Sequence, residues 1–458
     1  MLRMPAYLSP DRAHLAFVAA GTTLAIAGGF SLAVALPIDA ALGFNLGPRW
    51  LALVQAHGHL QSIGFAGLVI MGVALRVGPR FAGQHIRHPG LIPLVFFTVL
   101  AAVLLRATGQ ALADHSPFAA VMAAGAWLEV VAALLFAWLI VGATAAAARR
   151  GSPSAVFFVA GSFWFVTQAL FGAIWLTDAA IDDAALIPAP RNALLLFLQF
   201  FGFHLMFVLG VGLRALPTFF GRDLPSTRHA LAGFALVQAA IALTAAAFAW
   251  RAIDGGRIWE TESTGLVLLA LGFLATLALI GARGAPHRLR PATQPIGRLP
   301  QTAMAWLAIT SGLLIYFALR GAVDGRGLLP SESDAIRHLI GLGVITMAII
   351  GMAHIILPEF GVERLTGRSG RRRAWLFGLG LSIAAISRAS PGLTSDLVAS
   401  ESDYWHMASA GIIGFALIAW FGWLLLRAAR GQTMLLEQVA VNVDSTRRGP
   451  PSPAEGKD

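Results

Sequence analysis

Long apolar segments alternate with short polar segments along almost the whole chain. The apolar segments are about 20 residues long, which is the length that an α-helix needs to cross the hydrocarbon core of a bilayer. They are dominated by Ala, Leu, Val, Phe and Gly and lack the strict alternation of membrane β-strands. We therefore predict an all-α polytopic membrane bundle of about twelve transmembrane helices. The predicted spans are 14–36, 55–78, 90–112, 117–148, 154–178, 191–215, 227–249, 264–283, 300–320, 334–357, 373–391 and 404–428.

The polar segments between the predicted spans alternate in charge. Arginine is concentrated in the loops after the even-numbered spans, and most acids lie in the other loops; the only lysine is Lys457. Because positive loops stay on the cytoplasmic side, this pattern predicts cytoplasmic termini in a bacterial inner membrane. The segment 431–458 is polar and ends in Pro-, Ser- and Gly-rich sequence, so we predict a disordered cytoplasmic tail after a transmembrane domain at 1–430.

The second, sixth and tenth predicted helices share one spacing of small residues and proline. The three matching sets are His59, Gly64, Gly72 and Pro79; Phe197, Gly202, Gly210 and Pro217; and His338, Gly343, Gly351 and Pro358. The steps are 138 and 141 residues, and each step covers four predicted helices. A four-helix step preserves orientation, so we predict three parallel repeats at about 10–150, 152–285 and 299–430, related by an axis along the membrane normal.

Composition excludes several classes of protein. Of the 458 residues, 57% are hydrophobic and only 12% are charged, against about a quarter in soluble domains. The net charge of +10 does not indicate nucleic-acid binding, because the basic residues are scattered through short loops. The chain has no cysteine, which excludes disulfides, iron–sulfur clusters and thiolate-ligated haem. A bound metal would need His, Met or oxygen ligands.

Two histidines occupy equivalent positions in the predicted repeats. Parallel repeats place His59 and His338 at the same depth, near the extracytoplasmic surface. A histidine inside a membrane span is costly without a partner, so it suggests a function. Haem iron accepts an imidazole from each side. We therefore expect these two rings to face each other and to hold a haem b as axial ligands.

Four other histidines are candidates for a second metal or an opposing axial position: His57, His204, His354 and His406. His57 lies two residues before His59, about 200° away around a helix, so the two are expected to face different neighbours. His354 lies about 24 Å along the helix from His338, so these two cannot share one ion.

With these residues in hand, the chain resembles the NnrS family of bacterial membrane proteins. The family's first signature is a His-Ala-His-Glu stretch, then a Gly-Phe pair and a proline. The matching residues here are His57, Gly58, His59 and Leu60, then Gly64, Phe65 and Pro79. Leu60 stands where the family has glutamate, so no acid role is expected there.

Two further signatures carry the same resemblance. A basic residue and a proline at the end of the sixth helix are matched by Arg214, Ala215, Leu216, Pro217 and Phe219. The late signature is matched by His338, Gly343, Met347, Gly351 and Met352. The resemblance implies haem and copper as cofactors, nitric oxide as a diatomic ligand, and a role in the response to nitrosative stress. It names no electron-donor protein and assigns no catalytic residue.

A more distant similarity is to the main subunit of haem–copper oxidases and nitric oxide reductases, which has haem histidines on its second and tenth helices. It would place His204 on the copper-ligand helix. The chain lacks that family's histidine pair in the seventh helix, where only His229 is present, and the His-x-His of the tenth. Three functions stay open: an NnrS-like haem protein, a divergent reductase of this type, and a transporter built from parallel repeats.

Overall fold

The computed structural model describes residues 12–447 except 45, 48, 114, 116, 255, 257, 290, 292, 357–368 and 395–399. Within these residues every regular element is helical, and twelve helices are long and apolar enough to cross a membrane. Each predicted span falls on one of these helices. The predicted all-α bundle of about twelve transmembrane helices is therefore confirmed, and its outer surface implies contact with a lipid bilayer.

Four of the twelve spans contain a π-helical segment, and one begins with a short 3-10 turn. The first six spans are α1 (Ala13–Leu24) with η2 (Ala25–Phe30) and α2 (Ser31–Leu42); α3 (Arg49–His59) with η3 (Leu60–Gly67) and α4 (Leu68–Ala82); η4 (Pro89–Leu91) with α5 (Ile92–Ala111); α6 (Phe118–Arg149); α7 (Pro153–Ile181); and α8 (Ala189–Phe197) with η5 (Leu198–His204) and α9 (Leu205–Phe219). The last six are α10 (Thr227–Asp254); α11 (Trp259–Ile280); α12 (Arg298–Val323); α13 (Pro330–His338) with η6 (Leu339–Thr346) and α14 (Met347–Ile356); α15 (Gly370–Thr394); and α16 (Glu401–Arg447).

The π-helical segments η3, η5 and η6 recur at a regular spacing. They begin 138 and 141 residues apart, which are the steps that separate His59, Phe197 and His338. A π turn bonds residue i to i+5, so it disturbs the regular ladder and leaves carbonyl groups open to side-chain donors. The Ser62 carbonyl in η3 accepts from His204 at 2.9 Å, and the Gly341 carbonyl in η6 accepts from the Thr346 hydroxyl at 2.8 Å.

Glycines let the π segments approach neighbouring helices closely. Gly202 on η5 packs against Trp164 of α7, and Gly343 on η6 packs in the same way against Trp306 of α12. A Cβ added at these glycines would lie 2.7 and 2.8 Å from the indole Cγ atoms. Small residues at such contacts are what allows membrane helices to pack backbone to side chain.

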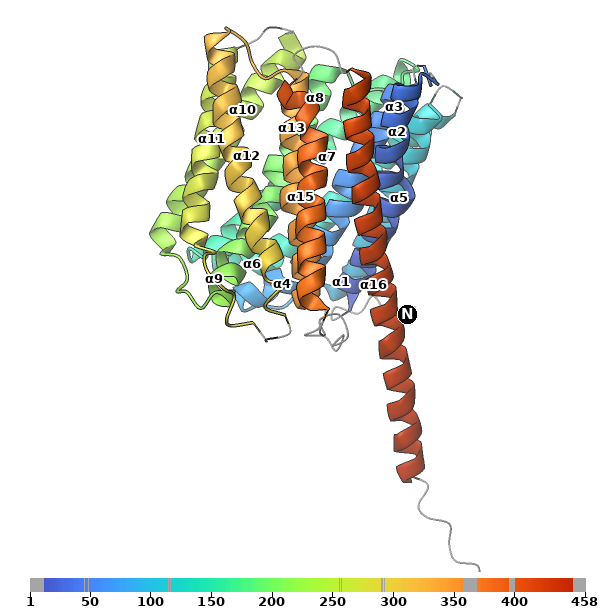
Figure 1. Cartoon of the computed structure of the whole chain (residues 1–458), viewed down its shortest axis with the longest axis vertical. Helices are drawn as coiled ribbons and strands as arrows, with labels where there is room; N and C mark the ends of the chain where they lie inside the picture. Colours follow the sequence, from blue (N-terminus) through green and yellow to red (C-terminus); the bar gives the residue numbers. More distant parts are fainter. Residues whose placement is uncertain are drawn as a thin grey trace, which may run out of the picture.

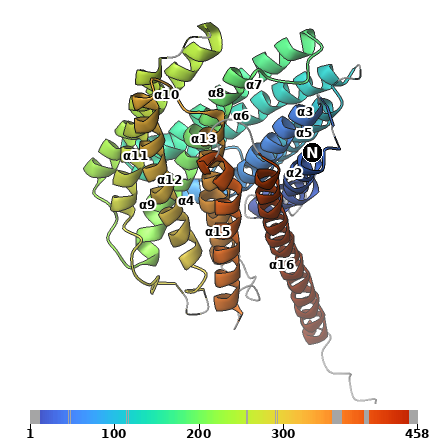
Figure 2. The ribbon, with the colours of Figure 1, turned by 45° about the horizontal axis from the view of Figure 1, so that its top comes forward.

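The last span closes the bundle against the first. α16 packs along α2, and Figures 1 and 2 show the two helices side by side. Gly414 of α16 lies against the ring of Phe30 at the end of η2. We call the end where α3, α8 and α13 begin the upper end, and the end where α4 and α9 finish the lower end, as drawn in Figure 1.

The ends of α4, α9 and α16 lie beyond the ends of the predicted spans. Pro79 and Pro217 do not end their helices but lie inside the last turns of α4 and α9, while Pro358 lies outside the described residues. The segment 431–447, predicted to be disordered, continues α16 below the bundle as far as Arg447 (Figure 1). Helix-favouring residues continue there without a proline, since the first proline after the span is Pro450. Residues 448–458 lie outside the described part of the chain.

Candidate functional site

The upper half of the bundle contains a cavity of about 250 Å³ between the three spans that carry η3, η5 and η6, and the first and last spans also line it. Its wall combines aromatic and aliphatic side chains with a small set of polar ones. The polar residues include His57, His59, Gln61, Ser62, Arg106, Gln199, Asp334, Arg337, His338, Arg388 and Tyr404. A largely apolar pocket with a few convergent polar groups is the usual form of a small-molecule site in a helical bundle.

His57 enters this cavity from α3 with one ring nitrogen already engaged. Its Nδ1 donates to the Gly29 carbonyl in η2 at 2.8 Å. A carbonyl can only accept, so this bond places the hydrogen on Nδ1 and leaves Nε2 available to a ligand. Histidines that bind metals commonly use this arrangement, in which a backbone carbonyl orients the ring.

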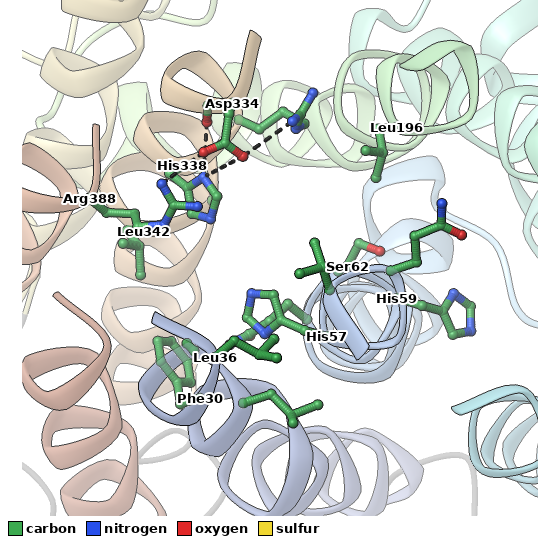
Figure 3. A pocket seen from close by; sticks show the side chains of 18 of the residues that line it. Phe30, Leu36, His57, His59, Ser62, Leu196, Asp334, His338, Leu342 and Arg388 are labelled. Carbon is green, nitrogen blue, oxygen red and sulfur yellow. Dashed lines mark hydrogen bonds and ion pairs between the residues drawn. The ribbon is translucent and has the colours of Figure 1, made fainter. Parts of the chain in front are cut away.

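His338 enters the same cavity from the end of α13 and is oriented in the same way. Its Nδ1 donates to the Asp334 carbonyl at 2.9 Å and lies 3.4 Å from that residue's carboxylate Oδ1. Arg388 of α15 lies 2.7 Å from Asp334 Oδ2, and Arg337 lies 3.2 Å from Oδ1. The Asp334 carboxylate therefore contacts the His338 imidazole and two guanidinium groups at once. Figure 3 shows Asp334 with His338 and Arg388. The Nε2 atom of His338 is again the nitrogen left for a ligand.

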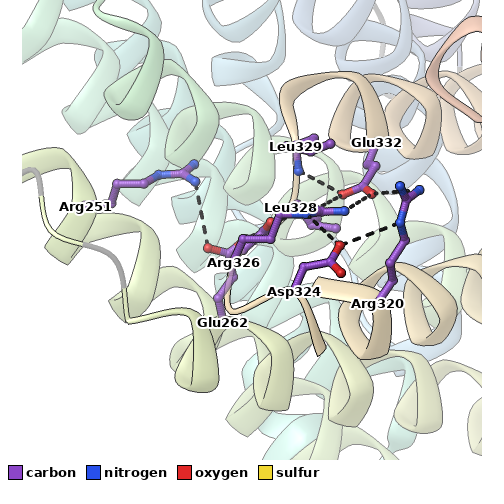
Figure 4. A network of polar contacts seen from close by, with 9 residues as sticks. Arg251, Glu262, Arg320, Asp324, Arg326, Leu328, Leu329 and Glu332 are labelled. Atoms are coloured by element: carbon purple, nitrogen blue, oxygen red, sulfur yellow. Dashed lines mark hydrogen bonds and ion pairs between the residues drawn. The ribbon is translucent and has the colours of Figure 1, made fainter. Parts of the chain in front are cut away.

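A network of charges fixes the start of α13 and with it Asp334 and His338 (Figure 4). The buried carboxylate of Glu332 accepts from the Leu329 N–H at 2.9 Å and from both terminal nitrogens of Arg326 at 2.9 and 3.0 Å. The positive end of the helix dipole also stabilises the Glu332 carboxylate, which lies at the start of α13. Its hydrogen bonds raise the pKa of the Arg326 guanidinium.

The loop before α13 is tied to α11 by a second buried carboxylate. Glu262 accepts from the Leu328 N–H at 2.8 Å, and Arg251 of α10 lies 3.8 Å from its other oxygen (Figure 4). Buried carboxylates are costly unless they are paired and hydrogen-bonded. These two therefore act as fixed anchors for the chain that carries His338.

His59 also lines this cavity, but its ring is turned away from His338 (Figure 3). Figure 3 shows its ring on the side of α3 away from the His57 ring. The His59 Nε2 lies 3.4 Å from Glu129 of α6, and Arg106 of α5 lies 3.6 Å from the same carboxylate oxygen. All three side chains are at most 5% exposed. They form an ionisable cluster inside the bundle, with the arginine and the glutamate neutralising each other.

This placement corrects the expectation that His59 and His338 face each other. Equal depth fixes the position of a side chain along the membrane normal but not its direction around its own helix, so two histidines at one depth need not face each other. His59 points towards Arg106, and His338 lies beside Arg388; each arginine is on the next long span of the chain. His57, about 200° around the helix from His59, has its ring on the side of α3 that is nearer to His338 (Figure 3).

A chain of side-chain hydrogen bonds links this cluster to η3 and η5. Gln168 of α7 donates to Glu129 at 2.9 Å, Gln199 donates to Gln168 at 2.9 Å, and Ser62 donates to Gln199 at 3.0 Å. Each of these groups is buried, so each bond satisfies an atom that would otherwise be costly.

The other candidate histidines are not brought into the cavity. His204 is fully buried and donates from Nε2 to the Ser62 carbonyl, so it cross-links η5 to η3. His354 lies in the lower half, where its Nδ1 donates to the Ile350 carbonyl and its ring packs near Phe377 and Phe421. His406 is exposed on α16.

The residues that sequence analysis missed are the partners rather than the histidines. Asp334, Arg388 and Arg106 lie near span ends or in a polar-looking stretch, where each could be an ordinary interfacial charge. A signal was present in the one carboxylate deep within the fourth span, Glu129, because such a residue requires a buried partner.

The histidines, aspartates and glutamates of the described residues form no group of three placed to hold a metal ion. Comparisons of the chain with known protein families and with curated proteins find no match. The site is thus interpreted from its own geometry.

Proposed function

We propose that this protein binds one haem b in the upper cavity, with His57 and His338 as its axial ligands. The observation that carries the proposal is that both imidazoles line one cavity. In each ring the Nδ1–H donates to a backbone carbonyl, so Nε2 is available to bind iron. His57 replaces His59 in the ligand pair expected from the sequence. Arg337 and Arg388 at the same cavity supply cations for the carboxylates of a haem.

The size of the cavity sets a condition on this proposal. About 250 Å³ lies just below the range of roughly 300–1,000 Å³ that small-molecule pockets occupy. A haem would therefore need side chains at the wall to change rotamer. The half-buried Met407 of α16 and Phe200 of η5 line this cavity, and methionine in particular adapts to such changes.

We propose that the function of this haem is the binding of nitric oxide in the response to nitrosative stress, as the resemblance to the NnrS family implies. Haem, when bound, would supply an iron that can bind a diatomic gas. The protein's own residues orient the two imidazoles and hold the cations beside them. The reductase alternative would need further metal ligands, and the described residues bring no such group together.

The test is an absorption spectrum with iron analysis of the full chain purified in detergent. We expect a Soret band, about one iron per chain, and a shift of the band when nitric oxide is added to the reduced protein. Absence of both the Soret band and stoichiometric iron, in protein produced with sufficient haem supply, would reject the proposal.

The repeat and the orientation belong to the same proposal. Equal spacing of η3, η5 and η6 and the matching Gly–Trp contacts support three parallel four-helix repeats. The arginines after α4, α6, α9 and α11 support a cytoplasmic lower end in a bacterial inner membrane. Because the chain has no cysteine, single cysteines introduced at Ser152 and Ser333 can test this by labelling from one side. We expect a membrane-impermeant thiol reagent to reach only Ser333→Cys in intact spheroplasts.

A further inference from the structure

A second cavity of about 80 Å³ lies in the lower half of the bundle, between α1, α4, α9 and α14. Its wall is built from Val, Ile, Ala and Phe side chains, with His14 and Met352 as the only residues that carry a nitrogen or sulfur atom in the side chain. Val18, Val69, Val208 and Ile349 represent the four spans that contribute to it.

The wall does not suit water. A buried water needs two to four polar partners, and among the lining side chains only the His14 imidazole offers a strong one. Apolar cavities of this kind stay dry and take up small apolar molecules, including xenon. The volume is several times the roughly 10–15 Å³ that one water-sized probe occupies, so a diatomic molecule has room.

The lower cavity continues the upper cavity along the same helices. Phe65 and Ile345 line the upper cavity, and Val69 and Ile349, four residues further along their helices, line the lower one. Residues four apart lie on one face of a helix, about one turn of 5.4 Å from each other. Only about one helical turn therefore separates the two cavities.

We propose that the lower cavity is a binding site for small apolar gases, the class that contains nitric oxide and dioxygen, and that it delivers them to the upper cavity. Such gases dissolve in the hydrocarbon of the bilayer, and this cavity lies within the membrane-spanning helices. Binding of gas depends on the lower cavity alone, whereas delivery rests on the proposed haem function above.

Xenon tests the binding. Crystals of the full chain, pressurised with xenon, are expected to show one anomalous peak between Val69, Val208 and Ile349. Ala348→Phe should fill the cavity and remove the peak, while Leu319→Phe, on the exposed face of α12, should keep it. If Ala348→Phe does not fold, Val73→Leu should fill a smaller part of the same cavity and reduce the occupancy of xenon. Absence of xenon from the wild type, or equal occupancy in the filled variant, would overturn the proposal.

Carbon monoxide rebinding after photolysis tests delivery. We expect a slower second-order phase in Ala348→Phe than in Leu319→Phe, and unchanged rates in both would reject the delivery role. A protein without a Soret band would reject the haem proposal instead, and the xenon result would stand independently of it.

Discussion

His57 and His59, two residues apart on α3, have their rings on opposite sides of the helix. The His57 ring is held by the Gly29 carbonyl at 2.8 Å and lines the upper cavity, whereas His59 lies 3.4 Å from the buried carboxylate of Glu129. A helix turns by about 100° per residue, so neighbours at this spacing cannot share a ligand. Both histidines line the upper cavity, but only His59 is paired with a buried carboxylate, and the two rings leave the helix on opposite sides.

We expect His57→Ala and His338→Ala to abolish stoichiometric haem binding, and His59→Gln to retain it. The two alanine variants each remove an imidazole whose Nε2 is available in the cavity. Soret absorbance per protein and iron content in detergent provide the measurement. His406→Ala, at an exposed position, is the control for effects of removing a histidine. Loss of haem from His59→Gln with retention in His57→Ala would reverse the assignment.

Glu129→Ala should destabilise the folded protein strongly. The substitution leaves the Arg106 guanidinium, whose side chain is 5% exposed, without the carboxylate that lies 3.6 Å away. Breaking a buried pair in this way typically costs about 3–5 kcal/mol, whereas replacing both partners by apolar residues costs much less. Unfolding by denaturant in mixed micelles should therefore show a large loss in Glu129→Ala and recovery in the double variant Arg106→Met/Glu129→Leu.

The matched control for Glu129→Ala is Asp178→Ala. Asp178 pairs with Arg191 at 3.2 Å, but its side chain is 49% exposed. Exposed pairs contribute about 0–1 kcal/mol, so this variant should unfold almost as the wild type does. Equal losses in the two alanine variants would show that burial of the ion pair does not determine its energy.

The fold could be predicted from the sequence because the bilayer imposes a length on every apolar segment. All twelve spans were placed by that length, and the small residues of the second, sixth and tenth helices marked the contacts that Gly202 and Gly343 make with tryptophan. The π segments could not be predicted, since no residue type specifies an i to i+5 bond. The prediction therefore assumed regular α-helical periodicity in the stretches where the π segments η3, η5 and η6 interrupt it.

The site could be predicted only in part. Depth follows from position along a span, so the sequence placed His59 and His338 at the same end of the bundle. Direction depends on rotation about each helix axis and on the partners available there, and Glu129 lies 70 residues from His59 in the sequence. The sequence also gave no sign that Asp334 would meet Arg388 from another span.

Glu332→Gln should loosen the start of α13 more than Asp324→Asn does. Glu332 is 2% exposed and accepts three hydrogen bonds, from both terminal nitrogens of Arg326 and from the Leu329 N–H. A hydrogen bond to a charged group contributes about 1.5–3 kcal/mol, and the neutral amide keeps only part of this. Hydrogen–deuterium exchange should rise over the segment 326–338.

Asp324 contacts the same Arg326 at 3.2 Å, but its side chain is 42% exposed, so water replaces the lost interaction in Asp324→Asn. Exchange in 326–338 should stay close to that of the wild type in this control. Increased exchange of equal size in both variants would indicate that the total negative charge near Arg326 matters, and that the buried carboxylate has no special role.

Gly202→Ala and Gly343→Ala should each destabilise the bundle, by about 1–3 kcal/mol, because the added Cβ would meet an indole ring at 2.7 or 2.8 Å. Gly312 provides a control on α12, the helix that carries Trp306, because a Cβ added there meets no atom within 4 Å. Gly312→Ala should be neutral or stabilising by up to about 1 kcal/mol, since alanine favours the helix. Denaturant midpoints of the three variants in micelles measure the difference. If the two contacts descend from one repeated unit, Gly202→Ala and Gly343→Ala should lower the stability by equal amounts. A loss of stability of the same size in Gly312→Ala would mean that the helix backbone, and not the indole contact, determines the effect.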